Sequence, residues 1–248
     1  AIGYQASYSN TTGDYNTAIG CGALYGNIAG NCNIAIGRCS LFSTTSGCYN
    51  TGIGSNTLKC NTTGLCNVAI GPNALNANTT GGDNIAMGYA SLESNTTSWY
   101  NVALGPQSMK SNTTGCYNNA IGYQASYSNT TGYQNNAIGH MALWANTEGL
   151  YNQAIGYNTL KANTTGCSNN ALGESALRYN TTGCYNNAIG RNSLLQNSTG
   201  CHNTGIGYAV LNLNTTGCNN AAIGQCALAS NTTGGCNTAM GAYALKGS

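Results

Sequence analysis

Residues 1–13 read AIGYQASYSNTTG, and residues 120–132 repeat those thirteen letters without a change. The shift of 119 residues is seven times 17, and cutting the chain every 17 residues aligns it from end to end without an insertion. Such a period is the signature of a repeat architecture, in which each repeat packs against its neighbours. The consensus is A-I-G-x-x-A-L-x-x-N-T-T-G-x-x-N-x, and we number its letters as repeat positions 1 to 17.

The repeat is too short and too rich in turn residues for a helical hairpin, but it accommodates two short strands and two turns. Stacked coils place equal positions about 4.8 Å apart in a parallel ladder. We therefore predict an all-β fold, a parallel β-solenoid (β-roll) of fourteen full coils and a partial one. Residues 1–248 are expected to form a single continuous repeat array, excerpted from a longer chain.

Several repeat positions have a direct physical interpretation. The bulky apolar residues at positions 2 and 7, such as Ile19 and Leu24, are expected to form the core. Glycine occupies position 3 of every repeat, which indicates a positive φ or a backbone approach too close for a β-carbon. The N-T-T-G segment is typical of a turn in which the glycine takes the left-handed conformation.

Asparagine occupies position 16 of every full repeat, which indicates a buried side chain that bonds amide to amide along the stack. The predicted ladder consists of Asn16, Asn33, Asn50, Asn67, Asn84, Asn101, Asn118, Asn135, Asn152, Asn169, Asn186, Asn203, Asn220 and Asn237.

Side chains alternate across the segment N-x-A-I-G, so Ile and the residue before Ala face one way while Asn, Ala and Gly face the other. The Ile face needs a core, and the small-residue face is equally constrained across the repeats. A strand constrained on both faces is usually covered on both. A neighbouring subunit is one candidate for the second cover, and relief of crowding at a tight corner is the other explanation.

The segments NTAIGCGAL (residues 16–24) and NNAIGYQAS (residues 118–126) resemble the head repeats of YadA-type trimeric autotransporter adhesins. That resemblance implies a left-handed parallel β-roll and trimers that associate through the small-residue strand. The longer phrase AIGYQA…NTTG…NxAIG is also similar to repeats of phage and giant-virus tail-fibre proteins. Adhesin heads typically use a shorter repeat with an apolar residue two before the Ile. In this chain that position is variable and holds Thr17, Asn119, Gln153, Val68, Ile34 or Ala221.

The titratable residues do not gather into a predicted active site. His140 and His202 lie three repeats apart, and the five acids Asp14, Asp83, Glu93, Glu148 and Glu174 fall in five different repeats. No carboxylate pair is evident, so we expect no enzyme and no cofactor. The seven bases look scattered and no apolar run approaches membrane-spanning length, so neither nucleic acid nor membrane insertion is expected.

Four of the thirteen cysteines, Cys167, Cys184, Cys201 and Cys218, occupy position 14 of consecutive repeats. Adjacent rungs place their α-carbons within disulfide range, so Cys167–Cys184 and Cys201–Cys218 are candidate staples, with Cys21–Cys39 a looser one. Oxidised staples would indicate an extracellular setting, and free thiols are the alternative. No metal site is expected, because no C-x-x-C occurs and histidine is scarce.

Position 10 carries an N-glycosylation sequon in eleven repeats, and the alternative is that Asn and Thr serve only the turn. The candidate acceptors are Asn10, Asn61, Asn78, Asn95, Asn112, Asn129, Asn163, Asn180, Asn197, Asn214 and Asn231.

The leading functional hypothesis is a structural, non-enzymatic fibre segment, a stalk or adhesive shaft on an extracellular, cell or virion surface. Its expected partners are further copies of itself, as a lateral homo-oligomer (a trimer by analogy) or a head-to-tail filament, and carbohydrate or a host surface. The alternative is a surface-binding module for glycan or ice on one ladder face. Ice binding is disfavoured, because the adjacent Thr pair diverges and no flat T-x-T face is present.

Overall fold

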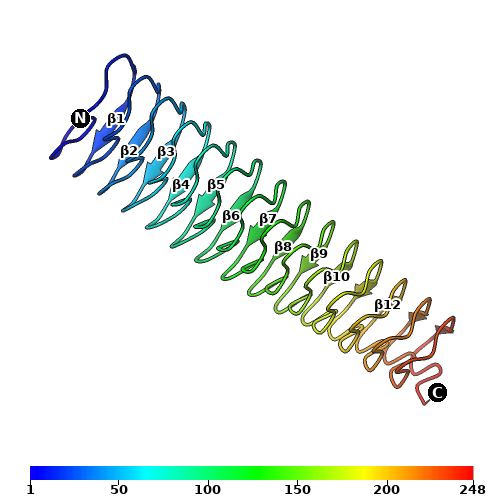
Figure 1. The fold of residues 1–248 in the computed structure, drawn as a ribbon. Coiled ribbons are helices and arrows are strands. Elements are labelled where there is room, and N and C mark those ends of the chain that lie inside the picture. Colours follow the sequence, from blue (N-terminus) through cyan, green and yellow to red (C-terminus); the bar gives the residue numbers. More distant parts are fainter. Residues whose placement is uncertain (248) are drawn as a thin grey trace. The chain divides into compact units, whose positions relative to one another are not determined.

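The structure is a computed structural model that describes residues 1–247. Its contacts divide the chain into two compact units, Ala1–Ile121 and Gly122–Ser248, which we call the N-terminal and C-terminal units. In each unit the chain folds into stacked coils of 17 residues, each with one three-residue strand (Figure 1). The predicted all-β parallel solenoid is confirmed, and the single continuous array stays a prediction.

The N-terminal unit contains β1 (Thr17–Ile19), β2 (Ile34–Ile36), β3 (Thr51–Ile53), β4 (Val68–Ile70), β5 (Ile85–Met87), β6 (Val102–Leu104) and β7 (Asn119–Ile121). The C-terminal unit contains β8 (Asn136–Ile138), β9 (Gln153–Ile155), β10 (Asn170–Leu172), β11 (Asn187–Ile189), β12 (Thr204–Ile206), β13 (Ala221–Ile223) and β14 (Thr238–Met240).

Each strand pairs in parallel with its neighbour at a shift of one whole repeat. Ala18 lies opposite Ala35 at the start of the N-terminal unit, and Ala171 lies opposite Ala188 in the C-terminal unit. Equal repeat positions therefore form ladders, and every side chain meets the same position of the next coil. A residue type that packs well against the same residue type in the next coil can therefore be used in every coil. This explains how a single 17-residue period extends through a unit.

The core lies under the small central residue of each strand, Ala or Gly, and not under the apolar residue that follows it. Ala18 is 1% exposed, whereas Ile19 directly after it is 38% exposed. The position-7 leucines, such as Leu24 and Leu41, are fully buried. The prediction of a Leu core is confirmed and that of an Ile core is wrong. The narrow interior of a 17-residue coil is filled by small residues, Leu and Asn, and strand alternation then places Ile outside.

The position-3 glycine is required for both reasons that the sequence predicts. Gly139 has φ 132°, and a β-carbon on it would lie 2.5 Å from the carbonyl oxygen of Gly156 in the next coil. The position-13 glycine serves packing alone, so its predicted left-handed conformation is wrong. The left-handed residues are instead at positions 5, 7 and 15, as in Asn158 (φ 53°), Leu160 (φ 50°) and Tyr151 (φ 59°).

Candidate functional site

Two ladders of buried asparagines run through each unit. At position 16, Asn186 donates from its backbone N (3.0 Å) and its Nδ2 (3.1 Å) to Oδ1 of Asn169, and its Nδ2 also donates to the Gly200 carbonyl (2.8 Å). Asn169 and Asn186 are at most 1% exposed. The amide-to-amide ladder predicted for position 16 is thus present, and it joins each coil to its neighbour through charge-neutral bonds that water does not reach.

The second ladder consists of the position-10 asparagines, which the sequence presents as glycosylation acceptors. Nδ2 of Asn180 donates to Oδ1 of Asn163 (2.8 Å) and to the carbonyl of Gly183 (2.9 Å), and the side chain is fully buried. The same burial holds for every sequon asparagine except Asn10. The glycosylation hypothesis is therefore corrected for the folded coils, because the atom that would carry the glycan is inaccessible and already bonded. Of the two interpretations of N-T-T-G, the structure supports the turn.

The buried sequon asparagines are Asn61, Asn78, Asn95, Asn112, Asn129, Asn163, Asn180, Asn197, Asn214 and Asn231.

Two residues that differ from the repeat consensus disturb the position-10 ladder. Thr44 replaces the position-10 Asn, and its buried Oγ1 has no hydrogen-bond partner. Ser98 replaces the position-13 Gly, and its Oγ lies unusually close to Oδ1 of Asn95, although it accepts a bond from Asn101 Nδ2 (2.8 Å). Both are sites where the repeat consensus fits the coil better than the residue present.

The cysteines at position 14 are free thiols that accept hydrogen bonds from the preceding coil. The backbone N of Cys167 donates to Sγ of Cys184 (3.0 Å), whose thiol contacts that of Cys167 at 2.8 Å. The backbone N of Cys201 donates likewise to Sγ of Cys218 (3.1 Å). Burial, followed by the hydrogen bond with Cys167, raises the pKa of the Cys184 thiol. The contact is compatible with the proposed Cys167–Cys184 staple, and oxidation of either pair stays a prediction.

The outer face of the strands is an apolar surface. It consists of positions 17 and 2, which flank the buried alanine, and we call it the outer strand face. In the N-terminal unit both positions are apolar in the four strands β2, β4, β5 and β6, whereas β3 has Thr51 at position 17. In the C-terminal unit Asn or Gln precedes the alanine from β8 to β11. Ile85 and Met87 are 37% and 40% exposed.

The bases are aligned and not scattered, which corrects the sequence interpretation. Five of the seven occupy position 8, at one edge of the coil: Lys59, Lys110, Lys161, Arg178 and Lys246. Aromatic residues share this position, and their rings stack from coil to coil, as between Tyr25 and Phe42 (centroids 4.8 Å apart) and between Tyr127 and Trp144 (5.9 Å). We call this line of position-8 side chains the position-8 edge.

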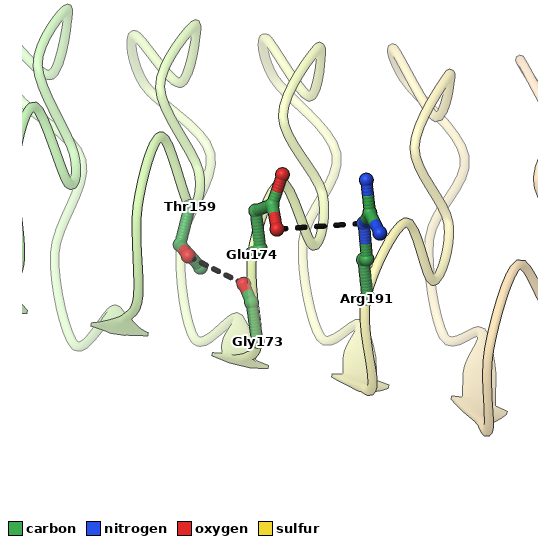
Figure 2. Close-up of polar contacts among 4 residues, drawn as sticks. All are labelled: Thr159, Gly173, Glu174 and Arg191. Carbon is green, nitrogen blue, oxygen red and sulfur yellow. Dashed lines mark hydrogen bonds and ion pairs between the residues drawn. The ribbon is translucent and has the colours of Figure 1, made fainter.

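Some of the other charged and polar side chains make contacts between adjacent coils. Figure 2 shows Arg191 Nε paired with Glu174 Oε2 at 3.4 Å, beside Thr159, whose Oγ1 donates to the Gly173 carbonyl at 2.7 Å. His140 stacks on a neighbouring tyrosine, Tyr157, with ring centroids 5.2 Å apart. These pairs join adjacent coils. Among residues 1–247, neither His140 nor His202 forms an ion pair with an acid.

A few other titratable residues interact in pairs or small groups, as Cys66 does with Asp83 and Cys48, and Tyr151 with Tyr133. Among residues 1–247, no three His, Cys, Asp or Glu side chains converge as a metal site would require. In that same range, no helix is long and apolar enough to cross a membrane. No protein-family model matches the chain, and neither a curated protein nor a solved structure matches it. The resemblance to adhesin and tail-fibre repeats therefore stays a prediction.

Proposed function

We propose that the chain is a non-enzymatic structural segment of an extracellular or virion fibre, a stalk or adhesive shaft built from stacked coils. The observation that carries this proposal is the bonding of equal positions from coil to coil within each unit, above all through the two buried Asn ladders. Each coil offers its neighbour the same bonds, so a stack of such coils resists bending and shear without a large apolar core. A fibre needs a shaft that is stiff and that can be lengthened by adding further coils.

The fibre model includes association with further copies of the chain through the outer strand face. Exposed apolar patches of this kind mark interaction sites, and parallel sheets are usually covered on both faces. The face toward a partner is therefore the Ile face, because the Asn/Ala/Gly face is the coil's own interior. The N-terminal unit is favoured for this contact, since Ile34, Val68, Ile85 and Val102 add a second apolar line beside position 2.

The test compares the assembly state of the unchanged protein with that of two variants. Light scattering and negative-stain microscopy measure whether the 25.3 kDa chain associates side by side. Ile85→Asn is expected to weaken association by at least tenfold, since it removes an exposed apolar residue from the outer strand face. Ile28→Asn is the matched control, because Ile28 is 50% exposed but lies at position 11, away from that face.

Two results would overturn the proposal. A chain that stays a single 25.3 kDa particle at every concentration contradicts association. Images of compact rather than rod-like particles contradict the shaft. Equal weakening by both variants would remove the outer strand face as the contact while leaving the shaft in place.

A further inference from the structure

A groove lies on the position-8 edge of the C-terminal unit, with a cavity volume of about 240 Å³. Six residues from three successive coils line it: Trp144, Ala145, Lys161, Ala162, Arg178 and Tyr179. They occupy positions 8 and 9 only, so the groove runs along the stack, across the direction of the chain. Its shape follows from the order of large and small residues in these two positions.

The floor and the end wall of the groove come from position 9. Ala145 and Ala162 form a low floor, and Tyr179 is the first bulky residue at this position. The backbone there is fixed, because the N–H of Ala145 donates to the Lys161 carbonyl (2.9 Å) and that of Ala162 to the Arg178 carbonyl (2.9 Å). The groove is thus preformed, and a ligand would not have to order it.

The aromatic side of the groove is Trp144, held by stacking. Its ring lies nearly parallel to Tyr127 (11° between planes, centroids 5.9 Å apart), and Lys161 Nζ lies 6.0 Å from its centroid. The buried indole Nε1 has no hydrogen-bond partner. Buried N–H groups in proteins ordinarily have a hydrogen-bond acceptor. The position of this ring therefore favours contacts of its apolar surface over a hydrogen bond from its N–H. Flat aromatic rings present such a surface to the apolar face of a ligand.

The cationic side consists of Lys161 and Arg178, which occupy position 8 of adjacent coils. Like charges directly opposite in a ladder are destabilising. At the same edge of the N-terminal unit, Lys110 is balanced by Glu93 in the adjacent coil (3.4 Å). In the part of the chain that the structure describes, no acid pairs with Lys161 or Arg178. An anion in the groove would supply the charge that Glu93 supplies to Lys110.

We propose that this groove binds an acidic saccharide, with the sugar ring on Trp144 and its carboxylate between Lys161 and Arg178. Arg178 suits a carboxylate because its guanidinium offers two parallel donors, and it is already oriented over the Tyr179 ring (5.2 Å). A saccharide fits better than a bare anion, because two aromatic residues and two alanines line the groove beside the two charges. The proposal names a ligand class for the adhesive form of the fibre and in that sense rests on the proposed function.

The test uses fluorescence of Trp144 in a Trp99→Phe background, since Trp99 is the other tryptophan of the chain. The probes are trigalacturonic acid and 3′-sialyllactose, with trigalacturonate methyl ester and lactose as their uncharged counterparts. We expect the acidic probes to change the fluorescence saturably and to bind at least tenfold more tightly than the neutral ones. Inorganic sulfate is expected to bind at least tenfold more weakly than either acidic sugar.

Variants separate the two halves of the groove. Arg178→Gln and Lys161→Gln are each expected to weaken the acidic probes at least tenfold, whereas Tyr179→Ser should weaken acidic and neutral probes alike. Lys110→Gln is the matched control, a position-8 base outside the groove, and should leave affinity unchanged. Circular dichroism verifies that each variant keeps the fold.

The outcomes that overturn the proposal are distinct. No saturable response to either acidic probe removes the site, and sulfate binding as tightly as the sugars reduces it to an anion site. Equal effects of Lys110→Gln and Arg178→Gln would show that general charge is responsible. Since the assembly measurements use Ile85→Asn and no ligand, failure of the fibre proposal and failure of this site give different results.

Discussion

Replacing Asn169 by Asp tests whether the buried amide ladder stabilises the coils. The two side chains have nearly the same shape, so the change removes only the Nδ2 donor. That donor bonds Asn152 Oδ1 (3.1 Å) and the Gly183 carbonyl (2.8 Å), whereas Oδ1 of residue 169 keeps its bonds from Asn186. An oxygen then faces two acceptor oxygens inside the unit.

The expected loss depends on pH. Each hydrogen bond contributes about 1 kcal/mol, and both acceptors keep one other donor. The protonated carboxyl can still donate its O–H to one of the two acceptors, so the variant should lose about 1 kcal/mol at pH 3. Burial near two oxygens favours the protonated carboxyl in the folded state, so the folded protein binds more protons than the unfolded chain above pH 4. Stability therefore falls as pH rises, by about 1.4 kcal/mol per unit of pKa elevation, so the loss at pH 7 exceeds the loss at pH 3.

Urea denaturation at the two pH values, with amide hydrogen exchange of the neighbouring coils, measures this loss. Asn170→Asp is the control, since Asn170 is the next residue and is exposed on β10. It should change stability by less than about 0.5 kcal/mol. A loss for Asn169→Asp below about 0.5 kcal/mol, or one equal at both pH values, would refute the stabilising role of the buried ladder.

Four further changes follow from single positions. Thr44→Asn should raise the free energy of unfolding by about 1 kcal/mol, measured by urea denaturation, because it replaces an unpartnered hydroxyl with the missing ladder amide; a loss would show that the site cannot hold an amide. Ser98→Gly should raise it by about 1 kcal/mol by relieving an overpacked contact, and no change in the urea midpoint would argue against strain there. Ala209→Gly should raise it by about 0.5 kcal/mol, because Ala209 has φ 51°, and thermal unfolding that comes earlier would contradict this. At pH 8, iodoacetamide should modify Cys184 more slowly than the exposed Cys236, because a raised pKa leaves less thiolate; equal rates in peptide mass mapping would contradict the burial of Cys184.

The ladder architecture was predictable because its requirements recur at fixed positions. Gly3 and Asn16 begin two lines of residues that do not vary among the full repeats, and both lines make the backbone or amide contacts expected of them. Which face of the strand is buried was not predictable from the alternation of side chains. Alternation shows which side chains share a face, but not which face points into the coil. The available signal was size: position 1 never exceeds alanine, while position 2 accepts Ile, Leu and Met.

The candidate sites were harder to predict, and for a different reason. N-T-T-G is at once a sequon and a turn, and turns usually lie on the surface, so burial of Asn180 has no signal within one repeat. The groove was accessible in principle, since sorting the bases by repeat position places Lys161 and Arg178 in adjacent rungs. Its floor was not, because it depends on alanines whose exposure only the folded stack reveals.

The sense of the asparagine bonds makes the two sides of a coil chemically different. In both ladders the amide donor belongs to the later coil and the acceptor oxygen to the earlier one, as in Asn186 to Asn169 and Asn180 to Asn163. The side-chain dipoles therefore point the same way throughout a unit. Two stacks can continue each other's ladders only when donors meet acceptors, so they would join head to tail. A head-to-head or tail-to-tail junction would set donor against donor or acceptor against acceptor.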